Sequence, residues 1–152
     1  MNDGAGHLSL VADGPWAGWL SWADRVPGTF LDAIGVSYSR SDAPGRATVM
    51  VATLPSHNNR MDALHGGFLA SFADHAYFAG LCAMGRLEQA GAVTVDLNMQ
   101  YCGSGRIGVD LRAEIELLRE TGRLIFMRLT LWQEDVLVAA SSATFRKASA
   151  SK

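Results

Sequence analysis

The sequence predicts an α+β fold in which a curled antiparallel sheet of about five to six strands wraps around one long central helix. Residues 68–84 are apolar on nearly every face, which is typical of a helix buried on all sides. Residues 92–146 alternate apolar and polar side chains over several strand lengths. The connections between these strands are short enough for antiparallel hairpins, so a meander is expected.

The N-terminal part is predicted to add a helix and two strands. An amphipathic helix at residues 16–25 is indicated by apolar residues at helical spacing, namely Trp16, Trp19, Leu20 and Trp22. A short helical turn is expected at 29–34. Strands are expected at 35–40, 46–54, 92–102, 107–118, 124–132 and 136–146. The central helix can bury every face only inside a curled sheet, and this arrangement is the hotdog fold.

Length and composition indicate one domain. The chain has 152 residues, 49% of them hydrophobic, and a formal net charge of −2. We expect a flexible N-terminus at 1–15, a single domain at 16–147 and a C-terminal tail at 148–152. The charge and the scattered arginines do not favour a nucleic acid partner. Without a signal segment or a long apolar run, the chain is expected to be cytoplasmic and to have no membrane association.

Three features are predicted to carry no chemistry. Cys82 and Cys102 are isolated, which is typical of free thiols in a reducing compartment. Residues 103–108 match the spacing of a dinucleotide-binding fingerprint, but strand alternation follows where a helix should begin, so a turn is expected. No metal is expected, because the histidine spacing gives no persuasive ligand set among His57, His65 and His75.

The stretch from His65 to Ala76, HGGFLASFADHA, is the most informative part of the chain. Gly66 and Gly67 stand where the central helix begins, and glycines there leave backbone N–H groups accessible. The helix dipole adds partial positive charge at the same point, which suits a developing oxyanion. Further along, Asp74 has no Lys or Arg at the three- and four-residue spacings that would neutralise it.

Two interpretations of Asp74 stay open at this stage. A carboxylate in an apolar pocket is what a general base or nucleophile requires. Alternatively, Asp74 is structural and accepts a hydrogen bond from Ser71 or Tyr77, one helical turn away. The glycine-rich helix start favours the catalytic interpretation.

The spacing of these residues predicts an oligomer. Gly67 and Asp74 are seven residues apart on one helix face and therefore about 10 Å apart, at a rise of roughly 1.5 Å per residue. This distance is too long for one small reacting group. If both residues act on the same carbonyl, the acid must come from a second copy whose helix lies antiparallel. We therefore expect a homodimer or a dimer-of-dimers tetramer with active sites shared between subunits.

Residues 28–147 resemble the PaaI-like (phenylacetate-pathway-type) hotdog acyl-CoA thioesterases. Asn59, His65, Gly67 and Asp74 match that family's motif, and Thr94 falls where a Ser or Thr commonly sits. The resemblance implies hydrolysis of an acyl-CoA thioester with an aryl or a short- or medium-chain acyl group. Coenzyme A would be part of the substrate, and no separate cofactor is expected.

The resemblance also implies a role for each of these residues. The N–H of Gly67 would polarise the thioester carbonyl with help from Asn59. Asp74 of the facing subunit would attack the carbonyl or activate water, and Thr94 would orient that water. His65 would either bond to the backbone at the helix start or transfer a proton.

Substrate contacts are expected around the helix start and on exposed turns. Gly66 and Phe68 flank Gly67, and an acyl pocket could be lined by Trp16, Trp19, Phe68, Phe72 and Met99. The phosphates of coenzyme A favour arginine partners, of which three lie on expected turns: Arg60, Arg106 and Arg123. One departure from the family is Asp62, where a Gly often stands.

Two other function classes remain open. A hotdog acyl-CoA hydratase or dehydratase would need an Asp/His pair on a different loop-and-helix pattern, which the adjacent Asp74 and His75 do not supply. A catalytically silent acyl-CoA-binding module would use Asp74 only as a structural residue. The activity of an Asp74→Ala variant separates these classes from a thioesterase.

Overall fold

The computed structural model describes residues 8–22, 27–87 and 91–148. Its α-helices are α1 (Phe30–Ile34) and α2 (Gly66–Ala83), and a 3-10 helix, η1, spans Pro55–His57. Its strands are β1 (Ser9–Leu10), β2 (Leu20–Ser21), β3 (Ser37–Ala43), β4 (Arg46–Val51), β5 (Ala92–Tyr101), β6 (Leu111–Glu120), β7 (Leu124–Gln133) and β8 (Val136–Lys147). All strands belong to one antiparallel sheet in the order β1-β2-β3-β4-β6-β7-β8-β5.

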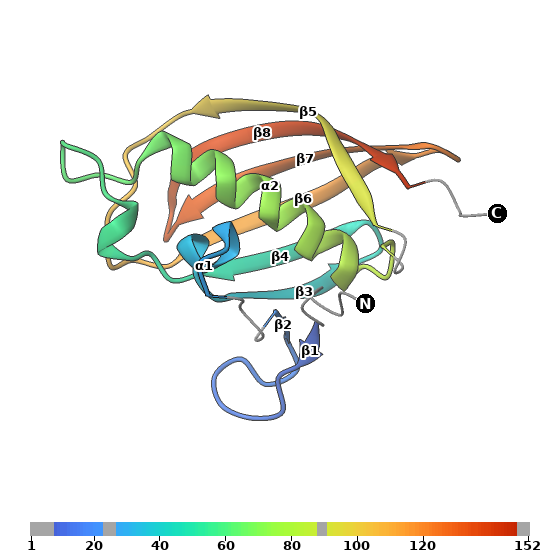
Figure 1. Cartoon of the computed structure of the whole chain (residues 1–152), viewed down its shortest axis with the longest axis horizontal. Coiled ribbons are helices and arrows are strands. Elements are labelled where there is room, and N and C mark those ends of the chain that lie inside the picture. The colour runs from blue at the N-terminus through green and yellow to red at the C-terminus, as the bar shows by residue number, and fades with distance from the viewer. Residues whose placement is uncertain (1–7, 23–26, 88–90, 149–152) are drawn as a thin grey trace.

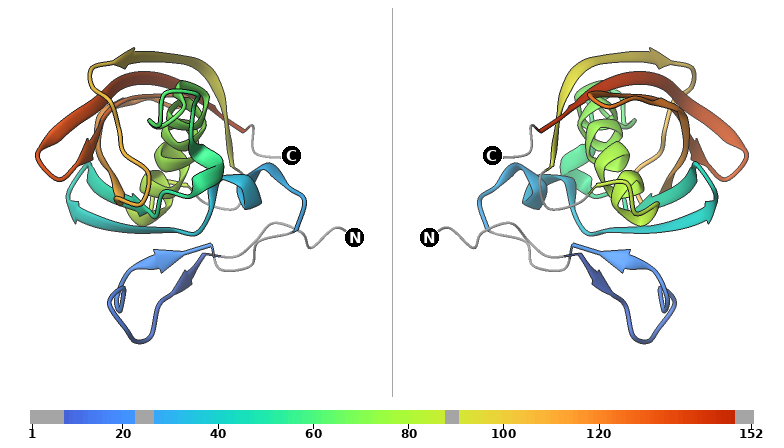
Figure 2. Two further views of the ribbon diagram at one scale, coloured as in Figure 1. Left: turned by 90° about the vertical axis from the view of Figure 1, so that its left-hand side faces the viewer. Right: turned by 90° about the vertical axis from the view of Figure 1, so that its right-hand side faces the viewer.

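The sheet curls around α2, which confirms the predicted hotdog fold (Figure 1). Viewed along the helix, the strands surround α2 on most of its circumference, and α1 lies beside it at the open side (Figure 2). The core consists of inward side chains of the sheet and the buried face of α2, including Phe72, Tyr77 and Phe145. The eight strands exceed the predicted five to six because β1 and β2 were not expected.

The predicted helix at residues 16–25 is wrong within its described part, 16–22. Ser9 and Leu10 pair with Ser21 and Leu20, and the chain between them turns through Gly14 and Gly18. Both glycines have positive φ, 78° and 84°, a backbone conformation that interrupts any helix. Residues 23–25 of the predicted helix lie outside the described residues.

Aromatic stacking holds the resulting hairpin against the sheet. The ring of Trp16 stacks on Tyr38 of β3 with centroids 4.6 Å apart and planes 7° apart. The guanidinium of Arg40, also on β3, lies 4.5 Å from the ring of Trp19. The tryptophans that suggested an amphipathic helix therefore pack across a hairpin.

Helix α2 follows the prediction closely at both ends. Arg86 N–H donates to the Leu81 carbonyl over 2.8 Å, and Gly85 has φ 67°, so the helix ends in a left-handed glycine cap. Gly80 lets α2 lie close to β6, because a Cβ at this position would lie 2.6 Å from Cδ1 of Ile115. No helix in the described part of the chain is long and apolar enough to cross a membrane.

The expectation that α2 is buried on every face is only partly right. The helix buries Leu69, Phe72, Ala76 and neighbouring residues against the sheet. Four positions along one face, Gly67, Ser71, Asp74 and Phe78, are not buried in this subunit. This open face carries both parts of the predicted site.

Candidate active site

His65 caps the start of α2. Its Nδ1 accepts a hydrogen bond from the Gly67 N–H at 2.9 Å. A Cβ on Gly67 would lie 3.0 Å from that nitrogen, so glycine is needed for the imidazole to approach. Gly66 in turn lies under the ring of Tyr101, whose hydroxyl donates to the Gly66 carbonyl at 3.1 Å. Because the two glycines lack a Cβ, the rings of His65 and Tyr101 can lie close to the backbone at the start of α2.

This cap changes which donors the helix start offers. The Gly67 N–H, predicted to polarise the carbonyl, is already bonded to His65. An accepting Nδ1 places the proton of a neutral imidazole on Nε2, so His65 presents an Nε2–H donor. In the described part of the chain, the N–H groups of Gly66 and Phe68 have no hydrogen-bond partner. These three N–H groups are the available donors at the start of α2.

The loop before α2 is held in shape by Asn59. Its Oδ1 accepts from the N–H groups of Met61 (2.7 Å) and Ala63 (3.1 Å). Asp62 has φ 53°, in the left-handed region, which gives a physical reason why a glycine often stands at this position in the family. Asn59 lines neither of the cavities described below, so the structure assigns its oxygen to the loop.

His57 ties this loop to both helices and was not singled out as a site residue in the sequence. Its ring stacks on Phe68 with centroids 3.6 Å apart. Its Nδ1 accepts from the Leu54 N–H, and its Nε2 donates to the Ala33 carbonyl at 2.9 Å. The stack on Phe68 and the hydrogen bond to Ala33 fix α1 relative to the first turn of α2, and the bond from the Leu54 N–H closes the local turn. Sequence proximity to the HGG motif was the one available signal.

Asp74 lies half-buried on the open face of α2 and accepts a hydrogen bond from Thr94. The Thr94 hydroxyl lies 2.6 Å from Asp74 Oδ1. Ser71 and Tyr77, the partners expected in the structural interpretation, bond elsewhere, to the Gly67 carbonyl and to Ser141. Within the described residues, Oδ2 of Asp74 has no hydrogen-bond partner and no cation pairs with the carboxylate.

A β-bulge in β5 places Thr94 toward Asp74. Thr94 pairs with Phe145 and Asp96 pairs with Thr144, which leaves Val95 as the extra residue. The alternation predicted for this strand put Val93, Val95 and Leu97 on one apolar face. The bulge breaks that alternation, so Val93 and Val95 are 51% and 60% exposed, while Thr94 bonds to the helix.

Two cavities lie along the open face of α2. The larger, about 720 Å³, has Asp74 and Thr94 on its wall together with apolar side chains of Trp22, α1, Phe78 and Leu97. The smaller, about 390 Å³, contains the helix start with His65, Gly67 and Phe68. Phe30, Ile34 and Ser71 line both cavities. The two halves of the predicted site therefore face neighbouring spaces within one subunit.

The predicted pocket lining is partly wrong. Phe68 lines the smaller cavity. Phe72 is fully buried in the core, and Trp16 and Trp19 belong to the hairpin cluster. Residues of α1 form the wall instead, because α1 covers the side of α2 that the sheet leaves open (Figure 2).

The three arginines predicted to bind phosphates lie in different places. Arg60 is exposed on the loop before α2. Arg106 is exposed on the β5–β6 loop, but its guanidinium pairs with Glu134 at 2.6 Å. Arg123 lies on the β6–β7 turn, at the end of the sheet where Arg86, just past α2, pairs with Glu120. Arg123 is therefore far from the helix start of its own subunit.

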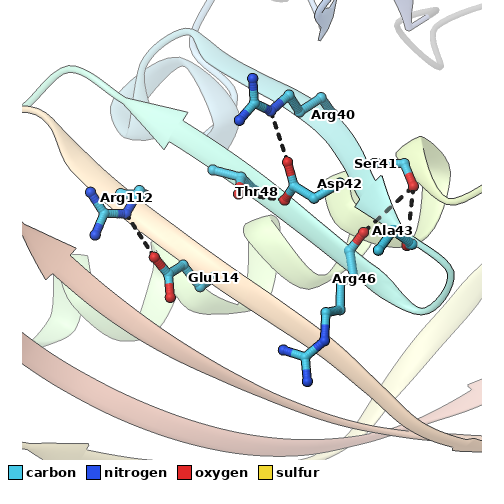
Figure 3. A network of polar contacts seen from close by, with 8 residues as sticks. All are labelled: Arg40, Ser41, Asp42, Ala43, Arg46, Thr48, Arg112 and Glu114. Atoms are coloured by element: carbon cyan, nitrogen blue, oxygen red, sulfur yellow. Dashed lines mark hydrogen bonds and ion pairs between the residues drawn. The ribbon is translucent and has the colours of Figure 1, made fainter.

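A third hollow, about 560 Å³, lies on the side of the sheet turned away from α2 and is rich in charge. Figure 3 shows part of it: Arg40 pairs with Asp42 at 2.8 Å, and Thr48 donates to the same carboxylate. Arg46 and Arg128 both contact Glu116. Because these charges neutralise one another and are largely exposed, the hollow offers no net attraction for an anion.

Three features were predicted to carry no chemistry: the histidines as metal ligands, the cysteines and the glycine-rich loop. No group of three potential metal ligands comes together among the described residues. Cys82 and Cys102 are free thiols, and burial raises the pKa of Cys82. Residues 103–108 form a loop between β5 and β6 with no helix after it, so the resemblance to a dinucleotide fingerprint is accidental.

Comparisons with known proteins give the family of the chain. Residues 61–140, more than half of the sequence, match the family model of the thioesterase superfamily. A relative from Pseudomonas aeruginosa named "Putative esterase PA0474" is 30% identical over 115 residues, which cover 76% of this chain and 85% of the relative. Acyl-coenzyme A thioesterase 13 of Homo sapiens is 29% identical over 91 residues, 60% of this chain and 64% of the relative.

Solved structures agree with this result. The TT0310 protein of Thermus thermophilus has a TM-score of 0.65 at 28% identity, covering 81% of this chain and 98% of its own. A variant of phenylacetic acid degradation protein PaaI from the same organism has a TM-score of 0.65 at 26% identity, covering 78% of this chain and 97% of its own. The chain belongs to the thioesterase superfamily, which confirms the predicted PaaI-like resemblance and the enzyme class, a thioester hydrolase.

Proposed function

We propose that the protein hydrolyses acyl-CoA thioesters to a free acid and coenzyme A. The observation that carries this proposal is Asp74, whose Oδ1 is held by Thr94 and whose Oδ2 lacks a protein partner in the described residues, on the wall of an apolar cavity. Two comparisons support the substrate class: one relative is named an acyl-coenzyme A thioesterase. A protein of Streptococcus pneumoniae TIGR4 named "Hypothetical Thioesterase Protein", which shares the fold at 17% identity and a TM-score of 0.61, was solved with coenzyme A.

In the proposed mechanism, the thioester carbonyl lies at the start of α2. The N–H groups of Gly66 and Phe68 and the Nε2–H of His65 stabilise the oxyanion that develops there, together with the helix dipole. Gly67 acts through its hydrogen bond, which fixes the His65 ring, so its contribution is to position a donor. This assignment differs from the sequence prediction, in which the Gly67 N–H itself contacts the carbonyl.

Asp74 supplies the negative charge that the reaction needs. Its carboxylate acts in one of two ways: it attacks the carbonyl carbon and displaces the coenzyme A thiolate, forming a mixed anhydride that water then hydrolyses, or it takes a proton from the attacking water. In both cases the proton released by the water goes to the thiolate, so that the products are the free acid and the thiol of coenzyme A. Thr94 holds Oδ1, so Oδ2 is directed to the substrate. Because α2 separates Asp74 from its own helix start by about 10 Å, the acid that acts at a given helix start comes from a facing subunit.

The edge of the sheet supports a dimer. β5 ends the strand order, is ten residues long, and exposes Val93, Val95 and Tyr101. An edge strand of this length presents unpaired backbone N–H and C=O groups on its free side, with which another strand can pair. We propose that β5 pairs antiparallel with β5 of a second copy, which brings the two α2 helices together in antiparallel orientation. The exposed Arg60 and Arg106 are then candidates for phosphates near the helix start, and Arg123 could reach that start only from the facing subunit.

Release of free thiol from acyl-CoA tests the proposal. Steady-state turnover of aryl, short-chain and medium-chain thioesters is compared between the native protein, Asp74→Asn and the surface control Asp135→Asn. We expect the Asp74 variant to lose at least about 100-fold in kcat, because the amide keeps the volume but not the charge. Equal turnover by Asp74→Asn would exclude the proposed mechanism. Binding of thioesters without any turnover by the native protein would favour the silent acyl-CoA-binding module.

A further inference from the structure

Tyr101 is the last residue of β5, and its side chain bonds to the first residue of α2. The hydroxyl donates a hydrogen bond to the Gly66 carbonyl at 3.1 Å. The ring lies so close to this glycine that a Cβ there would be 3.3 Å from Cε1 and 3.4 Å from Cζ of Tyr101. The proposed chemistry does not use this contact.

The peptide between Gly66 and Gly67 is hydrogen-bonded at both ends. Its carbonyl accepts from the Tyr101 hydroxyl, and its N–H donates to Nδ1 of His65 at 2.9 Å. Because a peptide unit is planar, a contact that orients the carbonyl also orients the N–H. Tyr101 and His65 are therefore coupled through one rigid group.

These two hydrogen bonds run in the same direction. The phenol donates to the carbonyl, and the N–H of the same peptide donates to the imidazole. Hydrogen bonds in such a chain polarise one another, so the first strengthens the second. A backbone N–H can only donate, so this bond keeps Nδ1 of His65 unprotonated and the proton of the neutral ring on Nε2.

The two glycines explain why the start of α2 needs a contact of this kind. Gly66 and Gly67 have no side chains to restrict their backbone, and N–H groups in the first turn have no partner within the helix. Local structure therefore holds this peptide only weakly. A hydrogen bond from outside α2 limits its rotation.

The residues on both sides of His65 are held by the chain at the end of β5 and just after it. The Leu64 N–H donates to the Gly105 carbonyl at 2.9 Å, and the Gly66 carbonyl accepts from Tyr101. The residue that carries the imidazole therefore stands between two fixed points.

The chain that provides these two points is itself anchored. The N–H groups of Cys102 and Gly103 both donate to the Val138 carbonyl of β8, at 2.9 and 3.0 Å. The side-chain amide oxygen of Gln133, a residue that is 2% exposed, accepts from the Arg106 N–H at 2.6 Å. The hydrogen bond to α2 thus comes from a firm support.

We propose that Tyr101 is a positioning residue that orients the His65 donor toward the substrate carbonyl. Its hydroxyl sets the plane of the peptide between Gly66 and Gly67, and the Gly67 N–H then holds the imidazole with Nε2–H available to the substrate. The inference rests on the proposed function, because it takes His65 as one of the groups that stabilise the oxyanion.

Tyr101→Phe keeps the ring and removes only the hydroxyl. The oxyanion develops in the transition state, so a loosely held donor lowers kcat more than it weakens substrate binding. We expect kcat of acyl-CoA hydrolysis to fall by about threefold to tenfold, with KM changing by less than about twofold. Thermal unfolding and light scattering check that the variant keeps its fold and its oligomeric state.

The chain has three tyrosines, and the other two give matched controls. Tyr77 donates to Ser141 in the core, and the ring of Tyr38 stacks on Trp16 of the N-terminal hairpin. Tyr77→Phe removes a structural hydrogen bond, and Tyr38→Phe removes a hydroxyl on β3. Both variants should keep the native kcat.

Two further measurements distinguish positioning from a direct contact with the substrate. In single-turnover rates, adding Tyr101→Phe to His65→Ala should cause less than about a twofold further loss, because the group through which Tyr101 acts is gone. Hydrogen exchange of the Gly67 amide, followed by NMR, reports on the same peptide without turnover. We expect this exchange to be at least about threefold faster in Tyr101→Phe and unchanged in Tyr38→Phe.

The outcomes separate this inference from the proposed function. Hydrolysis by the native protein with an unchanged kcat in Tyr101→Phe overturns the inference and leaves the function standing. An undiminished loss in the His65→Ala background also overturns it, since Tyr101 would then act on the substrate directly. Unchanged exchange of the Gly67 amide overturns it as well. If the native protein hydrolyses no acyl-CoA, the function is contradicted, and faster Gly67 exchange in Tyr101→Phe would still support the positioning of His65.

Discussion

Thr94 Oγ1 lies 2.6 Å from Asp74 Oδ1 and joins the edge strand β5 to the open face of α2. The bond exists because the bulge at Val95 interrupts the alternation of side chains along β5, so that Thr94 faces the helix. Asp74 is thereby held at the wall of the larger cavity with one oxygen unpaired among the described residues.

Replacing Thr94 by valine should leave Asp74 in place but unoriented. Thr94→Val keeps the branched shape and removes the donor, so we expect kcat to fall by about tenfold to 100-fold with little change in stability. Thr94→Ser keeps the hydroxyl and is expected to retain most of the activity. Steady-state kinetics on the three proteins checks this prediction. A Ser variant as impaired as the Val variant would show that shape, and not the hydrogen bond, matters.

Gly67→Ala should act through His65. The new Cβ would lie 3.0 Å from Nδ1 and 3.2 Å from Cε1 of His65, so the ring must shift by a few tenths of an ångström and its hydrogen bond to the Gly67 N–H is weakened. We expect at least a tenfold loss of kcat/KM, and no further loss when Gly67→Ala is added to His65→Ala. A double-mutant cycle in kcat/KM measures this coupling. Additive losses would mean that Gly67 contacts the substrate directly.

His75 should make folding stability depend on pH. Its pKa is lowered from 6.5 to about 4 in the folded protein, so the unfolded chain binds the proton more tightly. Stability is therefore highest above pH 6.5 and falls as the pH drops toward 4, by up to about 3 kcal/mol from this group. Urea unfolding across this pH range, compared with His75→Gln, isolates the contribution. Parallel curves for the two proteins would contradict it.

The exposed edge of β5 predicts how the dimer can be broken. Val95→Lys places a charge on the bulge of the edge strand and should disfavour pairing with a second copy. Val136→Lys is a matched control, since Val136 is comparably exposed but lies on β8, inside the sheet. Light scattering should find the 16.3 kDa monomer for Val95→Lys only, with at least a tenfold loss of activity. An active Val95→Lys monomer would show that one chain suffices.

The regular part of the fold could be predicted from the sequence because its signals are local. The apolar run of α2 and the alternation in the last three strands each appear within one segment. The structure has α2, β7 and β8 at nearly the expected bounds, whereas β6 begins at Leu111, four residues later than predicted. The N-terminal hairpin could not be predicted in this way. Trp16 and Trp19 have helical spacing, but contacts with Tyr38 and Arg40 of a distant strand decide their conformation.

The site was predicted in its residue types more than in its geometry. Asp74 and Thr94 were both singled out, yet the hydrogen bond between them depends on the bulge at Val95. The sequence gives no sign of this bulge, because residues 93–97 alternate regularly between apolar and polar side chains. The engaged Gly67 N–H depends on the tautomer and position of the His65 ring, which sequence patterns do not encode. His57 and His75 act through contacts with distant segments, at Ala33 and Ser37, which a sequence pattern does not show.

The central claim is that Asp74 of one subunit acts at the α2 start of another. Heterodimers of Asp74→Asn and His65→Ala chains, co-expressed with different tags and purified through both, test it most directly. Each single variant should be nearly inactive. The heterodimer contains one site with both defects and one with none, so it should recover about half of the native activity per dimer. A heterodimer as inactive as its parents would show that Asp74 and His65 act within one chain.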